Sequence, residues 1–155
     1  MSDCGATNFG GKFYISTTAE NEDLDQSGFS NLTYVEVPNL GTHGDTGVTQ
    51  NIISYSTWGR NVVCKGKGEA DAGSPDVEFL DVASAGMDLM EAAASVNNQN
   101  NYAFKVEWSD GSLEFNRGLV TGPTRMKGGN EDFKRVAFNL GMQQEPVTVY
   151  SVSSL

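Results

Sequence analysis

Residues 101–120, NYAFKVEWSDGSLEFNRGLV, constrain the fold more than any other part of the chain. Apolar residues occupy every second position there: Tyr102, Phe104, Val106 and Trp108. This period of two is typical of a strand with one buried face. The following pair, Asp110 and Gly111, is a strong hairpin signal, because glycine accepts a positive φ at no steric cost. The stretch therefore predicts two antiparallel strands joined by a tight turn.

A two-residue turn sets the register of this hairpin. It places three pairs opposite each other: Trp108 with Leu113, Val106 with Phe115, and Glu107 with Glu114. A slip by one residue would invert every side chain, so the turn and the apolar pattern support each other. We expect the apolar pairs on the buried face. The two carboxylates are expected on a solvent-exposed face, where their repulsion is tolerated.

Most other segments also predict strands. Short runs of β-branched and aromatic residues between turn residues predict strands at 12–17, 32–37, 62–69, 76–82, 121–127, 133–140 and 147–152. Residues 84–96 predict the one helix, which Ser84 caps and an alanine run favours. The pattern predicts a mainly β chain, an antiparallel β-sandwich or barrel with one flanking α-helix.

The 155 residues suffice for a single domain with a real core. Residues 1–8 are expected to form a loose N-terminal arm, and residues 18–31 a polar, acidic loop. These two segments would surround the sandwich without contributing strands to it.

Residues 38–60, PNLGTHGDTGVTQNIISYSTWGR, contain four glycines and no clear period. Structureless loops of this length are uncommon in compact domains and are often functional. The segment also carries more apolar surface than a solvated loop needs, at Leu40, Val48, Ile52, Ile53, Tyr55 and Trp58. Two interpretations stay open: the loop folds over the core of its own domain, or it packs on a neighbouring chain.

The charge balance disfavours some classes of function. A formal net charge of -10 argues against stable nucleic-acid binding, which usually needs a basic patch. No apolar run is long enough for a membrane span, and the N-terminus lacks the features of a secretory signal. We therefore expect a cytosolic chain with reduced thiols at Cys4 and Cys64; a disulfide between them is the alternative.

No set of residues predicts an active site. Residues 23–28, DLDQSG, match the first half of a calcium loop, but Tyr34 stands where the bidentate glutamate is needed. His43 is the single histidine, so neither a zinc site nor a Ser-His-Asp triad is expected around it. Glu107 and Glu114 resemble a glycosidase pair, but no apolar pocket is implied around them. We expect neither an enzyme nor a cofactor.

Charged residues are unevenly distributed along the chain. Residues 20–25 hold four acids, and four of the ten basic residues lie around the turn at 128–130: Arg125, Lys127, Lys134 and Arg135. These are either ordinary surface charges or two complementary patches. In the second case an acidic loop on one copy would meet a basic hairpin on the next, setting orientation more than affinity.

From residue 57 onward the order of elements resembles the major tail tube proteins of long-tailed (siphovirus-type) bacteriophages. The resemblance is carried by TWGRNVVCKGKGEADAG before the strand DVEFLDV, by the helix GMDLMEAAAS, by YAFKVEWSDGSLEFNRGLVTG, and by GGNEDFKRVAFNLGMQQEP. It concerns pattern and element order rather than a catalytic motif. Family members also carry a long loop before this block, which corresponds to residues 38–60.

The resemblance implies a structural protein that assembles into stacked hexameric rings, forming the virion tail tube through which DNA passes. Residues 38–60 would contact the adjacent ring, and strands of neighbouring subunits would join to line the channel. Implied partners are other copies of the chain and the tape measure, tail tip and tail terminator proteins, with assembly in the host cytoplasm. An acidic lumen would keep DNA from binding, and Glu107 and Glu114 are the candidates for that face.

Two alternatives remain at this point. One is a relative with the same fold, such as a tail-completion protein or a secretion tube. The other is a β-sandwich module that binds a ligand such as a carbohydrate through exposed aromatic residues, for which Tyr102, Phe104 and Trp108 are candidates. Their alternation, with Leu113 and Phe115 opposite, favours a core position instead.

Overall fold

The computed structural model describes residues 7–150. Within this range the chain forms β1 (Lys12–Ala19), α1 (Gln26–Ser30), β2 (Tyr34–Val37), β3 (Leu40–His43), β4 (Thr49–Tyr55), β5 (Cys64–Asp71), β6 (Asp76–Leu80), α2 (Ala85–Ala93), β7 (Tyr102–Glu107), β8 (Leu113–Met126), β9 (Arg135–Met142) and β10 (Val147–Val149). The mainly antiparallel β architecture expected from the sequence is confirmed. Most of the expected N-terminal arm, Cys4 and the end of the expected last strand lie outside the described residues.

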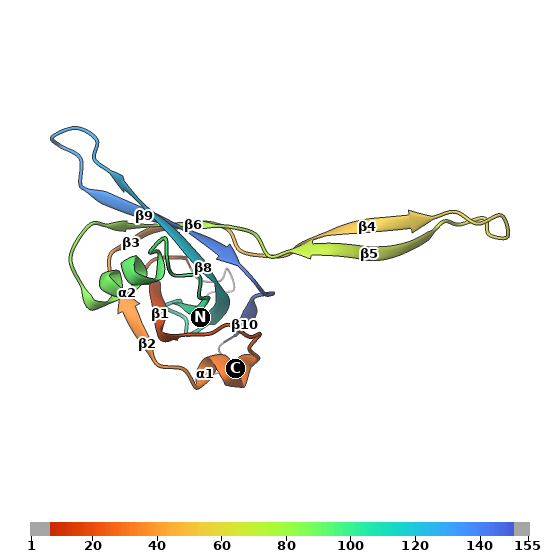
Figure 1. The fold of residues 1–155 in the computed structure, drawn as a ribbon, viewed down its shortest axis with the longest axis horizontal. Coiled ribbons are helices and arrows are strands. Elements are labelled where there is room, and N and C mark those ends of the chain that lie inside the picture. Colours follow the sequence, from red (N-terminus) through yellow and green to blue (C-terminus); the bar gives the residue numbers. More distant parts are fainter. Residues whose placement is uncertain (1–6, 151–155) are drawn as a thin grey trace.

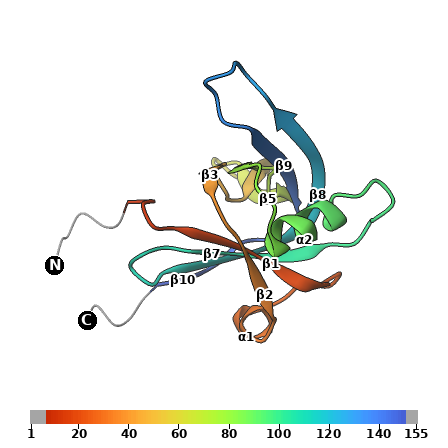
Figure 2. The same cartoon turned by 90° about the vertical axis from the view of Figure 1, so that its left-hand side faces the viewer.

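One antiparallel sheet folds back on itself to make the body of the molecule. Its strands lie in the order β2-β1-β7-β8-β9-β6-β3, and β10 also pairs with β8. Phe13 of β1 packs against Phe79 of β6 with ring centroids 5.6 Å apart, although three strands separate β1 from β6 in the sheet. The sheet therefore forms a β-sandwich, as expected (Figures 1 and 2).

The long strand β8 divides the sandwich into two halves. Residues 113–118 of β8 pair with β7, whereas residues 118–126 pair with β9. We call β2, β1, β7, β10 and the start of β8 the first half. The second half consists of β3, β6, β9 and the distal part of β8.

Alternating apolar residues of both halves fill the core between them. Its four buried phenylalanines are Phe13, Phe79, Phe104 and Phe138. Burial of one such side chain contributes about 1.5–3 kcal/mol to folding. In β9 every second residue is buried, which is the period expected of a strand with one face on a core.

The expected helix is confirmed as α2, which packs against this core through Met87, Met90 and Ala93. Ser84 caps it as expected, because its hydroxyl accepts a hydrogen bond from the backbone N–H of Met87 at 3.1 Å. A Cβ at Gly86 would lie 2.1 Å from the carbonyl oxygen of Glu36. The helix can approach β2 this closely only because residue 86 is a glycine.

The central hairpin forms, but its expected register is wrong by one residue. The observed pairs are Lys105 with Phe115, Val106 with Glu114, and Glu107 with Leu113. The loop has three residues rather than two, because Trp108 donates its N–H to the carbonyl of Ser112 at 3.0 Å. Gly111 has φ 90°, the conformation that closes a three-residue loop with a bulge. An Asp-Gly pair serves both loop lengths, so the sequence alone did not separate them.

The expected acidic loop at 18–31 is wrong in part, because it contains the short helix α1. The Asp25 side chain caps this helix by accepting a hydrogen bond from the N–H of Gly28 at 2.7 Å. Phe29 is fully buried and stacks on Phe115 of β8, with ring centroids 5.3 Å apart. The helix thereby covers the outer face of the first half (Figure 2).

A buried arginine ties this segment to the sheet. Arg117 of β8 donates to the carboxylate of Asp23, to the amide oxygen of Gln144 at 2.9 Å and to the carbonyl of Glu20 at 3.3 Å. Its side chain is 5 % exposed, so its charge depends on these acceptors. Three of the four acids of residues 20–25 are engaged within their own chain, because Glu20 also accepts a hydrogen bond from the hydroxyl of Thr18 at 3.1 Å, beside the contacts of Asp23 and Asp25.

Candidate functional site

The expected structureless loop at 38–60 is wrong. Residues 40–43 are β3, which pairs with β6 at the edge of the main sheet, and residues 49–55 are β4, which pairs with β5. β4 and β5 form a separate two-stranded sheet that projects away from the body (Figure 1). The segment lacks a clear sequence period because it joins two strands with different surroundings.

The β4–β5 hairpin exposes apolar side chains that a body strand would bury. Every residue of β4 is exposed. Ile52 is 72 % and Trp58 107 % exposed, and Val48, Ile53, Tyr55, Val62 and Val63 are exposed as well. Two-stranded hairpins are at best marginally stable in water, and exposed apolar patches usually mark interaction sites. This hairpin is the candidate functional site.

The six residues chosen from the sequence as apolar contacts divide into two groups. Leu40 packs against the core of its own domain, as the first interpretation of the segment expected. The other five, Val48, Ile52, Ile53, Tyr55 and Trp58, lie on the hairpin and are exposed, so folding over their own core is wrong for them. Sequence analysis missed Val62 and Val63. Their signal was the apolar run that follows the turn, which marks the return strand of a hairpin.

The charge of the hairpin is opposite to that of the body. Residues 50–67 contain Arg60, Lys65 and Lys67 and no acid. The rest of the chain carries all 20 Asp and Glu residues and the other seven Lys and Arg residues. At the tip Arg60 donates to the Sγ of Cys64, which is a free thiol, at 2.8 Å. The hairpin therefore presents apolar and positively charged groups together.

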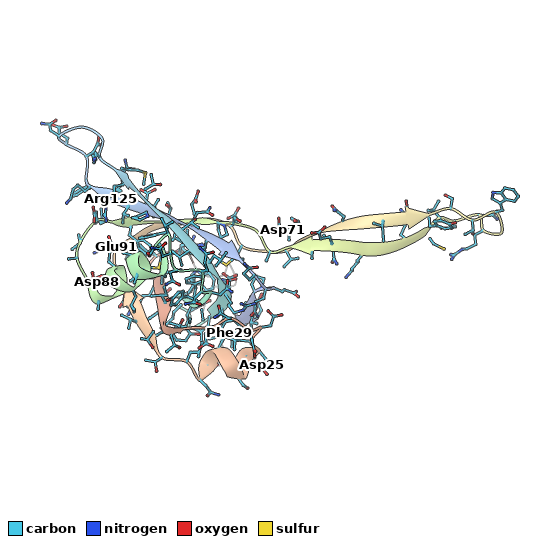
Figure 3. The ribbon with its side chains drawn as sticks, viewed as in Figure 1. Asp25, Phe29, Asp71, Asp88, Glu91 and Arg125 are labelled. Atoms are coloured by element: carbon cyan, nitrogen blue, oxygen red, sulfur yellow. The ribbon has the colours of Figure 1, made fainter. Side chains whose placement is uncertain are left out.

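The expected basic hairpin is partly neutralised within its own chain. Arg125 pairs with Glu91 (both labelled in Figure 3) and with Asp81, and Arg135 pairs with Glu78 at 3.4 Å. The hydrogen bonds that the Arg125 guanidinium donates to Glu91, and then to Asp81, raise its pKa above its ordinary value. Lys127 and Lys134 have no ion pair among residues 7–150. Two of the four cations thus remain for an external partner.

Glu107 and Glu114 lie on opposite faces of the sheet. Neighbouring residues of a strand point to opposite sides, and Glu114 pairs with Val106 rather than with Glu107. Glu107 lies near the hydroxyl of Tyr14 on the outer face, at 3.5 Å. Burial, and then the charges of Glu107 and Glu36, raise the pKa of the Tyr14 hydroxyl. The two carboxylates therefore cannot act together on one surface.

A cavity of about 530 Å³ opens beside Glu114. It is lined by Asn8, Gly11, Leu40, Gly41, Thr42, His43, Gly44, Asp45, Thr46, Val106, Trp108 and Glu114. Glu114 accepts hydrogen bonds from the hydroxyl of Thr46 at 2.7 Å and from the amide of Asn116 at 3.2 Å. The Nε2 atom of His43 is buried and has no hydrogen-bond partner among the described residues. The lining of the cavity includes both apolar and negatively charged side chains.

The aromatic residues considered for carbohydrate binding do not form an exposed platform. Phe104 is fully buried in the core, and Tyr102 and Trp108 pack against it. Tyr102 accepts a hydrogen bond from Asn98 at 3.0 Å, and Trp108 donates one to Asn8 at 3.1 Å. These contacts favour the core position over the ligand-binding alternative.

Two further observations concern other kinds of site. Within residues 7–150 no group of three or more His, Cys, Asp or Glu side chains could hold a metal ion. The helices in that part of the chain are too short and too polar to cross a membrane.

Known structures share this fold. No family model and no curated protein sequence matches the chain. The SPP1 tail tube is similar with a TM-score of 0.64 and 14% identity, over 96% of this chain and 81% of that one. A chain of the anti-feeding prophage baseplate has a TM-score of 0.62 and 11% identity, covering 97% and 98%. A chain of the PVC sheath-tube complex, from an extracellular contractile injection system in the extended state, has a TM-score of 0.64 and 9% identity, covering 96% and 94%.

The three structural similarities agree, at the level of the fold, with the resemblance to tail tube proteins seen in the sequence. They extend over nearly the whole described chain, including the residues before 57, where the sequence pattern was less informative. All three similar chains belong to assemblies whose names include a tail tube, a baseplate or a sheath-tube complex. The fold expected from the resemblance is confirmed: the chain has the phage tail tube fold.

Proposed function

We propose that the protein is a structural subunit that assembles with other copies of itself into stacked hexameric rings, forming a tail tube that conducts DNA. The observation that carries the proposal is the exposed, apolar β4–β5 hairpin on a tail tube fold. A hairpin of this kind gains stability only when a partner covers it. The related chains of multi-subunit assemblies support a second copy as that partner.

Ring closure requires two complementary edges on each subunit. In the second half of the sandwich, β3 is one free edge, since it pairs with β6 alone. The other is the distal part of β8, because β7 pairs with β8 only as far as Gly118. An edge-to-edge contact between β3 of one copy and distal β8 of the next would repeat around a ring and leave neither of these two edges unpaired.

The outer face of the second half suits the wall of a DNA channel. Its residues form one row across four strands, Thr42, Glu78, Ala137 and Thr124. A second row consists of Asp76, Asn139 and Thr121. These side chains are short or acidic, so they would leave room for DNA and would not attract its phosphates.

The earlier lumen candidates fit this arrangement less well. Glu107 lies on the outer face of the first half, which α1 partly covers, and Glu114 lies in the cavity. We therefore propose Asp76 and Glu78 as channel residues, with Glu107 and Glu114 as the competing choice. The basic residues Lys127 and Lys134 remain candidates for contacts between subunits.

The proposal extends to the setting of the tube. We infer that it lies in a virion tail, assembles in the host cytoplasm, and meets the tape measure, tail tip and tail terminator proteins at its lumen and ends. A secretion-tube relative is the second candidate, because one similar chain belongs to an extracellular contractile injection system. Passage of DNA distinguishes the two.

Assembly is tested by electron microscopy and sedimentation of the purified protein over a range of concentrations. The wild type is expected to form tubes or stacked rings with a central hole. The variant Ile52→Thr/Tyr55→Ser/Trp58→Ser should remain monomeric or form only single rings. Val96→Ser is the matched control, because Val96 is 89 % exposed and lies outside the hairpin. Strictly monomeric wild-type particles at every concentration would contradict the proposal.

The channel face is tested by charge reversal. Tubes of Asp76→Lys/Glu78→Lys should retain short duplex DNA at low salt and release it at high salt, because new cations would face the phosphates. Tubes of Glu107→Lys should behave like the wild type. Retention by the Glu107→Lys tubes alone would instead assign the channel to the first half. Wild-type tubes that never admit DNA would favour the secretion-tube alternative.

A further inference from the structure

We propose that the cavity beside Glu114 receives the tip of the β4–β5 hairpin of a second copy of this chain. We define the tip as residues 55–63. In this arrangement Trp58 enters the cavity, and Arg60 lies beside the carboxylates of Asp45 and Glu114. The inference rests on the proposed self-assembly and names the surface that accepts the hairpin.

The tip exposes aromatic and basic side chains of the kind that bind in a pocket on a partner. Trp58 is fully exposed, and Tyr55 and Val62 are each at least 70 % exposed. Tryptophan, tyrosine and arginine are the residues that contribute most to binding when they fill a pocket on a partner. The positive charge of Arg60 adds a preference for an acidic partner.

The cavity has the complementary chemistry. Its volume of about 530 Å³ lies within the range of pockets that enclose a group of several rings. Leu40, Val106 and Trp108 supply apolar surface, and Asp45 and Glu114 supply negative charge.

The occupant has to come from another copy. The hairpin projects away from the body as a continuous two-stranded ribbon, paired from Thr49 and Asp71 at its base to Tyr55 and Cys64 near its tip (Figure 1). Its own tip is therefore remote from the cavity of the same chain. When the tip of one copy enters the cavity of the next, the second copy still presents a free tip. Such a head-to-tail contact is open-ended, as stacking of rings requires.

Other surfaces of the body fit the tip less well. The end of the β8–β9 hairpin carries Lys127 and Lys134 beside Glu131 and Asp132, so it offers Arg60 no net negative charge. A second cavity lies at the base of the β4–β5 hairpin, but its lining is mostly polar and includes Lys67 of the hairpin itself. Of the two cavities, the one beside Glu114 pairs apolar surface with acids and lacks a cation.

Cysteine cross-linking tests the contact directly. In a Cys4→Ser/Cys64→Ser background, one preparation carries Gly59→Cys and another, with a different mass tag, carries Thr46→Cys, because the Thr46 side chain reaches Glu114 in the cavity. A Cβ at Gly59 meets no atom within 4 Å, so Trp58 and the turn stay intact. Mixing under mild oxidation should give a disulfide-linked heterodimer. Gly59→Cys mixed with Ser95→Cys, an exposed position beyond α2, should give little or none.

Charge exchange gives an independent readout. Trp58→Ala should raise the critical concentration for assembly at least about tenfold, the size expected for a central anchor residue. Arg60→Glu and Asp45→Lys should each raise the critical concentration as well. The double variant Arg60→Glu/Asp45→Lys should bring it back most of the way to the wild-type value. Rescue requires that the two side chains meet across the interface.

The outcomes separate this inference from the proposed function. Loss of assembly in Trp58→Ala, with normal assembly of Asp45→Lys and equal cross-linking to positions 46 and 95, would overturn the cavity as acceptor but retain the tube. A wild-type protein that does not assemble, together with a Gly59→Cys variant that does not cross-link, would overturn both. Cross-linking to Thr46→Cys together with charge rescue supports the docking contact.

Discussion

The sandwich and the β4–β5 hairpin are made of the same antiparallel pairing, but they differ in where their apolar side chains go. In the sandwich, Phe13 and Phe104 are fully buried, and the alternation on β9 places every second side chain in the core. In the hairpin, Ile52 and Trp58 face solvent. The body thus stabilises itself, whereas the hairpin carries surface whose burial must come from elsewhere.

The largest expected effect belongs to the centre of the sandwich. Phe104→Ala should lower the free energy of unfolding by about 3–5 kcal/mol, because it removes a fully buried aromatic side chain and leaves a cavity. Urea denaturation of the monomer, followed by circular dichroism, measures this loss. A loss below about 1 kcal/mol would mean that the core relaxes around the site, and the contrast with the hairpin would weaken.

A smaller loss is expected at the buried arginine of β8. Arg117→Met should cost about 2–3 kcal/mol, because Gln144 and the carbonyl of Glu20 lose a charged donor in a buried setting. Hydrogen exchange should show faster opening of α1, which the Arg117 contacts hold near the sheet. Arg125→Met is the matched control: it removes two ion pairs, with Asp81 and Glu91, but the side chain is exposed, so its effect should be clearly smaller.

Loss of the helix cap of α2 should lower the stability of the body by less than either of the two preceding substitutions. Ser84→Ala should destabilise the body by about 1 kcal/mol, because the N–H of Met87 loses its acceptor. Thermal unfolding of the variant beside the wild type provides the measurement. Ser84→Asp should keep most of the stability, because a carboxylate accepts the same hydrogen bond; an equal loss in both variants would argue against capping.

The smallest effect on folding is expected at the hairpin tip, where the effect on assembly is largest. Trp58→Ala should change the free energy of unfolding of the monomer by no more than about 0.5 kcal/mol, since the indole is fully exposed. Denaturation and sedimentation of the same samples measure both quantities. A stability loss comparable to that of Phe104→Ala would show that the tip packs within its own chain.

Several parts of the fold followed directly from the sequence. The alternation in β7 and β9, the cap at Ser84 and the alanine-rich helix led to a sandwich with a flanking helix, and these features are local. The short helix α1 was missed because its only strong signals are the cap at Asp25 and the buried Phe29, inside a run of polar residues. Helices this short depend on tertiary packing more than on propensity.

The sequence predicted apolar residues that belong to the candidate site but not how they are arranged. The apolar residues of the segment were identified, but the sequence could not separate Leu40, which packs on the core, from Ile52, which is exposed. Both lie in strands, and the distinction depends on whether another element covers them. The positive charge of the hairpin against an acidic body was present in the sequence, but it became meaningful only once β4 and β5 were known to project together.

By itself the sequence determined the strand-rich class, the helix at α2, the acidity of the chain and the resemblance in element order to tail tube proteins, because these rest on residue type and short-range spacing. Tertiary structure alone decided the register of the central hairpin, the separation of Glu107 from Glu114 onto opposite faces, and the projection of the β4–β5 hairpin. The physical reason is the same in each case. A strand's hydrogen bonds and burial are set by its partner, and the partner lies far away in sequence.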